Sequence, residues 1–444
     1  MKRIFQILDT NEAQMSKIKV GLYLVNKGYK GVDLSSPENG NPGIGGTQYN
    51  FLTLPYYYMK YFDDVEFVFY AHLTDKLPEG FEATEVTGVT DAARKAKEGG
   101  CDLFIYRPTQ DAEGRAFLED LKDIRIKTIA WVHNTPFKCL GKIAKHPYIV
   151  RYVNVSKEQY DMLRDHPIIY KSEMIHNGFD PKHYIPKELV KKEKSVVYMG
   201  SLIHAKGFHV LARVWKRVIE KVPDAKLGVI GSGQLYNRAS KLGKWELADE
   251  FYESLFRPYL SDENGEKLNS VIFYGVLGKE KIPIMQKALI GCPNPSGATE
   301  NCPGVAIEFQ ACGTAIVSGA FWGLLDTVDN NNTGLLGVND DKLVENIVYL
   351  LRNKHKAIEL GCNGIEFVKE KFNHEKISSK WQQLFGNIAA EKNADILPID
   401  QNPDYEYKQL SEKMRLLKEK YRILKWIPAY IQIRAYHRKV KKIF

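Results

Sequence analysis

Long uninterrupted apolar runs are missing from this sequence. No stretch approaches the roughly 18 apolar residues that a membrane-spanning helix needs. The first residues also lack the basic, apolar and small-residue segments of a secretory signal, so we expect a cytoplasmic protein. No segment recurs with a period of about 20–50 residues, which argues against a repeat architecture. These absences favour an ordinary globular protein.

Cysteine pairs are missing as well. The six cysteines are Cys101, Cys139, Cys292, Cys302, Cys312 and Cys362, and no two of them form a CxxC motif. Their spacing matches no zinc site. Because there is no secretory context, we expect reduced thiols, most of them buried.

The chain is too long for a single hydrophobic core. Its 444 residues, with a hydrophobic fraction of 44%, predict two domains. Strand-like runs alternate with helical patterns in both halves; the runs are KVGLYLV, VEFVFYA, DLFIYRP, KTIAWVH and RYVNVSK, then KSVVYMGSL, AKLGVIGSG, SVIFYGV, ALIGCPN and TAIVSG. Two such alternations predict an α/β fold in which two Rossmann-like, doubly wound domains face each other across a cleft.

The proline-containing segment 180–194 is the expected linker between the halves. The predicted parts are an N-terminal extension over 1–14, a first domain over 15–183, a second domain over 184–372, a helix over 373–390 that returns to the first domain, and a basic amphipathic tail over 391–444. From Glu412 to the C-terminus, eleven Lys and Arg stand against two Glu. Residues 412–444 alone therefore match the whole net charge of +9.

Two glutamates lie eight positions apart in ENCPGVAIE, residues 300–308. Glu308 falls in the apolar run VAIEFQA, where a lone carboxylate is costly unless something binds it. Pro303 fits the first helical position, so Gly304 and Val305 would offer free N–H groups to an anion. A ribose could satisfy Glu308 with two hydroxyls; a solvated helix face or a structural salt bridge would explain the pattern equally well.

Three further stretches carry polar groups where ligands bind in open α/β sheets. YMGSLIHAKGFHVL, residues 198–211, predicts a strand, a glycine-containing loop with Lys206, and a helix, an arrangement suited to phosphate. NPGIGGTQYNFLTLPYYY, residues 41–58, carries a glycine cluster that lets the backbone approach a ligand. His133 in TIAWVHNTPF follows a strand. An ordinary surface lysine, a flexible loop and a structural histidine are the competing interpretations.

The glutamate spacing and its surroundings resemble a known family. The block PSGATENCPGVAIEFQACGTAIVSGAFWGLLDTVDNNNTGLL is similar to the donor-site block of retaining glycosyltransferases of family four, which have the two-domain GT-B fold. The likeness spans roughly residues 15–385 and is strongest in the second half. It implies that the first domain faces the acceptor and the second holds a nucleotide sugar.

The resemblance also implies roles for particular residues. Glu308 would hold the ribose hydroxyls, and Glu300 would lie beside the donor sugar. The diphosphate or sugar would meet Lys206 and the amides of Gly304 and Val305. Gly45 and Gly46 would face the donor across the cleft, and His133 would contact the transferred sugar or its phosphate. One departure is Ser201, where the family often has an arginine, so His204 or a residue elsewhere would have to supply the second cation.

The motifs and the resemblance together imply a retaining, metal-independent transferase. It would move a sugar from a nucleoside-diphosphate sugar to a hydroxyl of a saccharide or lipid-linked acceptor, in surface polysaccharide or glycolipid assembly, without a cofactor. One alternative is a non-catalytic nucleotide-sugar-binding or membrane-associated scaffold of the same fold. A nucleotide-dependent oxidoreductase fits less well, because no GxGxxG follows a strand directly.

The basic tail carries Leu, Ile, Tyr and Trp between its cations, a composition suited to an anionic membrane surface. We therefore expect a cytoplasmic protein with peripheral contact to the inner face of the membrane. A basic helix packed on the body of the protein is the competing interpretation. Nucleic acid is not an expected partner, because the rest of the chain shows no basic patch.

Overall fold

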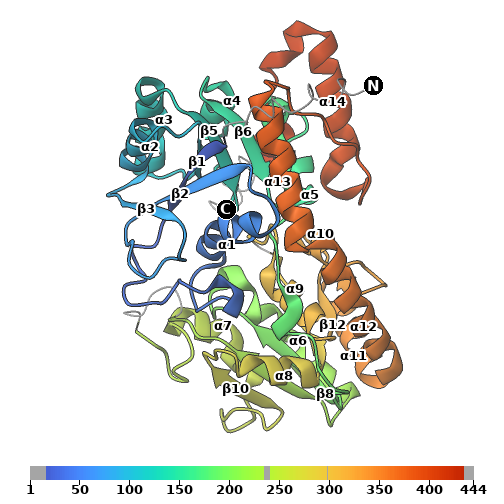
Figure 1. The fold of residues 1–444 in the computed structure, drawn as a ribbon. Coiled ribbons are helices and arrows are strands. Elements are labelled where there is room, and N and C mark those ends of the chain that lie inside the picture. The colour runs from blue at the N-terminus through green and yellow to red at the C-terminus, as the bar shows by residue number, and fades with distance from the viewer. Residues whose placement is uncertain (1–16, 235–240, 298, 435–444) are drawn as a thin grey trace, which may run out of the picture.

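The computed structural model describes residues 17–234, 241–297 and 299–434, and they form two α/β domains (Figure 1). The first domain contains a seven-stranded parallel sheet in the order β3-β2-β1-β4-β5-β6-β7. Its strands are β1 (Ile18–Leu24), β2 (Val65–Ala71), β3 (Glu82–Glu85), β4 (Leu103–Tyr106), β5 (Lys127–Val132), β6 (Ile149–Asn154) and β7 (Ser172–Met174).

The second domain repeats this plan with a six-stranded parallel sheet in the order β10-β9-β8-β11-β12-β13. Its strands are β8 (Glu193–Met199), β9 (Lys226–Ile230), β10 (Val271–Gly275), β11 (Ala288–Gly291), β12 (Ala315–Gly319) and β13 (Gly334–Gly337). In each sheet the chain starts at a central strand, adds strands toward one edge, and then continues from the centre toward the other edge, as in doubly wound nucleotide-binding sheets. The predicted fold of two Rossmann-like domains is confirmed.

Helices cover both faces of each sheet. Those of the first domain are α1 (Gly46–Tyr61), α2 (Val89–Glu98), α3 (Ala112–Ile124), α4 (Leu140–Lys145) and α5 (Lys157–Asp161). Those of the second are α6 (Phe208–Lys221), α7 (Glu250–Leu260), α8 (Lys281–Lys287), α9 (Gly304–Ala311), α10 (Leu324–Thr327), α11 (Asp340–Arg352) and α12 (Lys354–Lys371). Because both faces are covered, strands such as β4 and β12 are buried along their whole length, which explains their continuous apolar runs.

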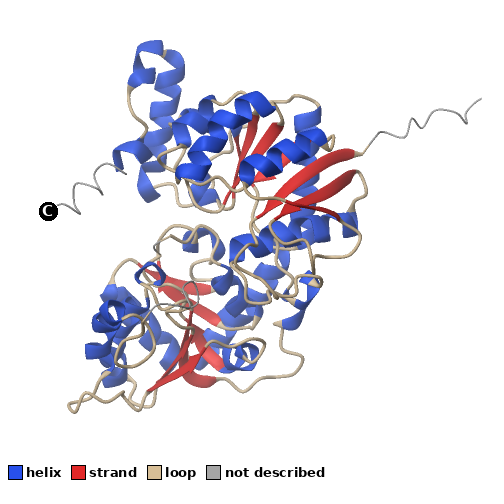
Figure 2. Cartoon of the chain, turned by 90° about the vertical axis from the view of Figure 1, so that its left-hand side faces the viewer, coloured by secondary structure: helices blue, strands red, loops and turns tan. Residues whose placement is uncertain are grey.

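One helix returns from the second domain to the first. After α12 ends at Lys371, α13 (His374–Ala389) packs against α1. Its Trp381 lies edge-on to Trp131 of β5, with ring centroids 5.0 Å apart. In Figure 2 the two domains stand one above the other. The return of the chain thus adds α13 to the hydrophobic core of the first domain.

The segment after α13 folds back over the first domain. It leads to α14 (Lys408–Lys420), which Figure 1 shows in red beside that domain. Lys408 is 1% exposed and its ammonium lies 2.8 Å from Glu158 and 3.1 Å from Asp161 of α5. The basic region thus begins as a packed layer, as the competing interpretation held. Residues 435–444 and the predicted extension 1–14 lie outside the described residues.

The described residues confirm the expectation for the thiols. All six cysteines are free, and Cys101, Cys139, Cys292 and Cys312 are buried. No helix within the described ranges is both long and apolar enough to cross a bilayer.

Candidate active site

A cavity of about 660 Å³ lies where the carboxyl ends of the two sheets meet. The first domain contributes residues of α1 and the loops after β5 and β7, and the second contributes the loops after β8 and β11, the start of α9, and Lys281 of α8. Seven of the eight predicted site residues line it; these are Gly46, His133, Lys206, Glu300, Gly304, Val305 and Glu308. The structure thus brings seven of the predicted residues together in one cavity at the strand ends that the sequence analysis used.

The loop after β8 holds Lys206 in the cavity. Gly207 follows with a φ of 68°, a left-handed conformation that glycine adopts without strain. A Cβ there would lie 2.5 Å from Asn294 Oδ1 and 2.6 Å from Ser296 Oγ, so no larger residue fits. This tight contact joins the loop after β8 to the loop after β11. It brings Lys206 Nζ to 2.8 Å from Glu300 Oε1, although the two residues are 94 positions apart.

The Glu300 carboxylate is held on two sides. Asn294 Nδ2 donates to its Oε1 at 2.9 Å, in addition to the bond from Lys206. The loop that carries Glu300 is conformationally strained, since Thr299 has a φ of 62°, which is unusual for a β-branched residue. Backbone strain of this kind concentrates at functional sites.

The helix α9 presents its N-terminus to the cavity. It begins at Gly304, with Pro303 as the N-cap, so Pro303 precedes the first helical position that the sequence analysis gave it. A Cβ at Gly304 would have no neighbour within 4 Å, which leaves its backbone open to a ligand. The N–H groups of Gly304 and Val305 have no acceptor inside the helix and lie at the positive end of the helix dipole. An anion in the cavity would meet both.

Glu308 lies in the second turn of α9 and forms a salt bridge. Lys281 Nζ donates to its Oε2 at 2.6 Å, and the Glu308 side chain is 15% exposed. Both residues also line a neighbouring cavity of about 640 Å³, formed by the glycine-rich loop and residues 276–282. The structural salt bridge considered on the sequence is therefore present, and it lies at the junction of two cavities.

Lys281 is the functional candidate that the sequence analysis missed. It begins α8, immediately beyond the loop that follows β10, so the strand-end rule could have marked it. It is a second lysine in the cavity, besides Lys206. Ser201 is buried and donates to the Ser232 carbonyl, whereas His204 stacks on His209 with ring centroids 4.6 Å apart and does not line the cavity.

His133 lies at the end of β5, between the domains. Its Nε2 is 3.1 Å from Asn177 Oδ1, and its backbone carbonyl accepts a bond of 2.7 Å from Asn301 Nδ2 of the second domain. Burial lowers the pKa of His133 to about 3, with the hydrogen bond to Asn177 opposing the shift. The imidazole is therefore neutral at pH 7, so it can exchange hydrogen bonds but cannot balance a phosphate charge.

The two predicted glycines of the first domain separate slightly. Gly46 opens α1 and lines both the cavity between the domains and the neighbouring cavity of about 640 Å³, whereas Gly45 lines only the neighbouring one. A Cβ at Gly46 would meet nothing within 4 Å, so its backbone is accessible. Gly45 is more restricted, because its N–H donates to Tyr29 Oη at 2.9 Å.

The second domain matches a known protein family. Residues 181–367, which contain β8 to β13 and the glutamate pair, match the family model described as glycosyl transferases group 1. The second domain of this chain is therefore similar to that family.

Two curated proteins are similar to this chain at low identity. An uncharacterized glycosyltransferase of Haemophilus influenzae is 25% identical over 277 residues, which cover 60% of this chain and 71% of the relative. The capsular polysaccharide biosynthesis glycosyltransferase CapM of Staphylococcus aureus is 23% identical, over 50% of this chain and 52% of its own. The match to CapM thus spans about half of that protein.

A solved structure is similar to most of the chain. The Anabaena protein HepE in complex with UDP-glucose superimposes with a TM-score of 0.58 and 15% identity, covering 83% of this chain and 99% of HepE. At this identity the likeness concerns the fold, and it includes both domains.

Within residues 17–234, 241–297 and 299–434, no group of three or more His, Cys, Asp and Glu is arranged to hold a metal ion.

Proposed function

We propose that this glycosyltransferase moves a sugar from a nucleoside-diphosphate sugar to an acceptor hydroxyl, with retention of the anomeric configuration and without a metal. The observation that carries the proposal is the grouping of Lys206, Lys281 and the N-terminus of α9 around the glutamate pair in one cavity. Departure of a diphosphate from an anomeric carbon needs fixed positive charge at the leaving group, and this grouping supplies it.

The two ion pairs suggest a division of labour. Lys206 and the amides of Gly304 and Val305 would stabilise the leaving diphosphate, with Glu300 orienting Lys206 and facing the sugar. Glu308 would accept hydrogen bonds from the ribose, and Lys281 would balance its charge and supply the cation that Ser201 does not. The neutral His133 would contact the transferred sugar.

Retention follows here from attack on the same face that the diphosphate leaves. A double displacement would need a carboxylate nucleophile on the opposite face of the sugar. Glu300 is only 12% exposed and is held by Lys206 and Asn294, which suits a positioning carboxylate better than a free nucleophile. The anomeric configuration of the product, followed by proton NMR from the start of the reaction, tests this part of the proposal.

The acceptor is proposed by analogy with CapM and its part in capsular polysaccharide biosynthesis. We infer a saccharide or lipid-linked acceptor in surface polysaccharide or glycolipid assembly, bound on the side of the first domain. Metal independence is tested by activity after chelator treatment, which we expect to leave the rate unchanged.

A donor screen tests the proposal as a whole. UDP-, GDP- and ADP-sugars are compared by thermal shift, and the true donor raises the melting temperature because it binds only the folded state. Slow release of free sugar from that donor separates an enzyme from a scaffold, which would bind without hydrolysis. A nucleotide-dependent oxidoreductase would instead respond to a nicotinamide dinucleotide and to none of these sugars.

A further inference from the structure

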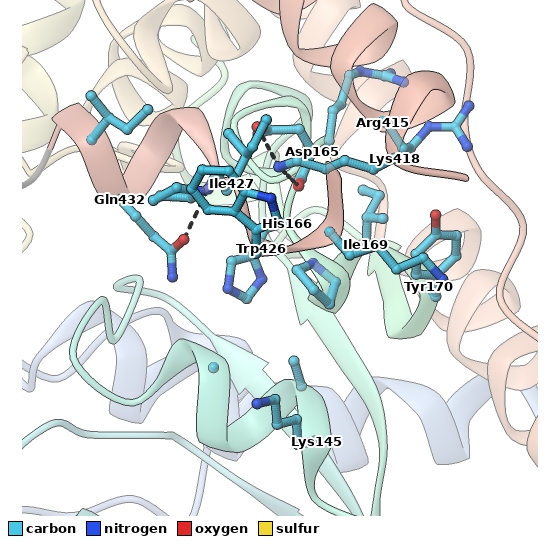
Figure 3. A pocket seen from close by; sticks show the side chains of 18 residues that line it. Lys145, Asp165, His166, Ile169, Tyr170, Arg415, Lys418, Trp426, Ile427 and Gln432 are labelled. Atoms are coloured by element: carbon cyan, nitrogen blue, oxygen red, sulfur yellow. Dashed lines mark hydrogen bonds and ion pairs between the residues drawn. The ribbon is translucent and has the colours of Figure 1, made fainter. Parts of the chain in front are cut away.

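A second large cavity, of about 850 Å³, lies away from the glutamate pair, between the first domain and the end of the chain (Figure 3). Its walls come from α4, the short 3-10 helix Pro167–Lys171, α14 and the segment 425–433. None of its lining residues lines the proposed donor cavity. It is therefore a separate feature that glycosyl transfer does not explain.

The polar lining of this cavity is strongly cationic. Five Lys and Arg line it against one acid, Asp165; the cations are Lys145, Arg164, Arg415, Lys418 and Lys425. Carboxylates neutralise both arginines, because Arg164 pairs with Asp161 and Arg415 with Glu412. Within the described part of the chain, Lys145 and Lys425 have no ionic partner. Lys145 comes from the first domain and Lys425 from the tail, so each side of the cavity wall contributes a lysine.

The remaining lining is apolar and part of it is exposed. Trp426, Ile427, Pro428, Ala429 and Ile433 line the tail side, and Pro167 and Ile169 line the other. Trp426 is 76% exposed, and nearby Ile423 is 75% exposed. In Figure 3 the indole of Trp426 lies at the centre of the cavity, with Lys145 across from it. A tryptophan and an isoleucine exposed beside lysines are typical of segments that lie at the interface of an anionic bilayer.

The tail side of the cavity is held in place by Asp165. This carboxylate, 5% exposed, accepts the Tyr430 backbone N–H at 2.9 Å and the Lys418 ammonium at 3.3 Å. Ala429 and Ile431 are each 2% exposed and join the core of the first domain. The segment is thus anchored on both sides of Trp426, and the cavity is formed before any ligand arrives.

We propose that this cavity binds the phosphate headgroup of an anionic lipid in a bilayer. Lys145 and Lys425 hold the phosphate, the apolar wall contacts the first methylenes of the lipid chains, and Trp426 and Ile423 enter the interface. The lipid stays where it is in the bilayer, and the protein docks on it through the first domain, the side on which the acceptor is proposed to bind.

Vesicle co-sedimentation of the full chain tests the proposal. Wild-type protein is expected to pellet with vesicles of equal parts phosphatidylcholine and phosphatidylglycerol, and to stay in solution with phosphatidylcholine alone. Lys145→Gln combined with Lys425→Gln is expected to bind about thirtyfold more weakly, since each lysine near an anionic surface contributes a factor of roughly five. Trp426→Ala is expected to bind more weakly as well, whereas Phe251→Ala, which truncates a 72% exposed phenylalanine of the second domain, is not.

A matched control lies on the tail itself. Lys413→Gln combined with Lys420→Gln removes the same charge from exposed positions of α14 that do not line the cavity. This pair is expected to cost only a few-fold in affinity, because neither side chain lines the cavity and neither can contact a phosphate bound in it. Equal loss in the two double variants would mean diffuse attraction by a basic tail and would overturn the cavity site.

Three further outcomes decide against the proposal. Saturation by soluble glycerol phosphate, with release from the vesicles, would assign the cavity to a free phosphate ester. Tighter binding to a DNA duplex than to the vesicles would assign the surface to nucleic acid. A change of oligomeric state in the Lys145→Gln, Lys425→Gln protein without vesicles, seen by light scattering, would assign it to a second copy of the chain.

Discussion

At the scale of single residues, the two glutamates differ in what surrounds them. Glu300 is bound by Lys206 and Asn294 in one cavity, while Glu308 meets Lys281 at the junction of two cavities. Each carboxylate therefore has a lysine that could shift toward a phosphate and leave it free to bind a hydroxyl. This difference leads to two predictions about donor binding and turnover.

Glu308→Ala is expected to weaken donor binding by roughly 10–100-fold, because hydrogen bonds to a charged group contribute about 1.5–3 kcal/mol. The thermal shift with the donor should disappear at a concentration that saturates the wild type. Glu359→Ala, an exposed glutamate of α12 paired with Lys356, serves as the control and should keep the full shift. An unchanged shift in Glu308→Ala would remove the ribose role.

Lys206→Gln and Lys281→Gln are expected to separate turnover from binding. Loss of Lys206 should lower kcat by about 10²–10³, the usual cost of removing one group that stabilises developing charge. Loss of Lys281 should mainly raise the donor KM. Its charge would stabilise the bound donor and the transition state equally, so its removal weakens binding more than it slows turnover. Steady-state kinetics with the identified donor measures both, and the reverse split would exchange the two roles.

At the scale of elements, α14 is the part whose position depends most on buried charge. Lys408 lies between Glu158 and Asp161, and burial raises the pKa of Glu158 while Lys408 opposes that shift. Asn402, just before α14, also donates to Glu158 at 2.8 Å. The helix and the first domain thus share one charged core.

Lys408→Ala is expected to lower the free energy of unfolding by about 3–5 kcal/mol, because it leaves the buried carboxylate of Glu158 without its counter-charge, whereas Asp161 keeps its partner Arg164. Lys413→Ala, at an exposed position of the same helix, should change it by no more than about 0.5 kcal/mol. Urea denaturation followed by tryptophan fluorescence measures both. Similar small effects in the two variants would mean that α14 contributes little to the stability of the first domain.

The sequence predicts the elements better than their contacts. The strands, the start of α9 near Pro303 and the loop with Lys206 follow from local patterns of apolar residues, proline and glycine. Lys281 follows a strand end and could have been marked on that ground, but its pairing with Glu308, 27 positions away, could not be predicted from either local pattern. The packing of Lys408 was likewise hidden, since a lysine in a basic segment gives no sign that two carboxylates about 250 residues earlier will bury it.

At the scale of the whole molecule, three buried histidines connect stability to pH. Burial lowers the pKa of His133 and His374 to about 3 and that of His166 to about 4. In the unfolded chain a histidine has a pKa of about 6.5. The folded state keeps these rings neutral, while the unfolded state takes up protons once the pH falls below that value.

The free energy of unfolding is therefore expected to fall as the pH drops from about 6.5 toward 4, by roughly 1 kcal/mol per pH unit for each histidine. Above about pH 6.5 these groups should have no effect. Urea denaturation at a series of pH values measures the slope, and His355→Gln, at an exposed position, should leave it unchanged. A flat profile between about pH 6 and about pH 4.5 would contradict the buried, neutral state of these rings.

The central claim is that the cavity between the two domains binds a nucleotide sugar by its diphosphate and ribose. A crystal structure with the donor identified in the thermal-shift screen tests this most directly. The account predicts a diphosphate bonded to Lys206 and to the amides of Gly304 and Val305, with the ribose hydroxyls on Glu308. A nucleotide bound elsewhere, with both glutamates still held only by their lysines, would contradict it.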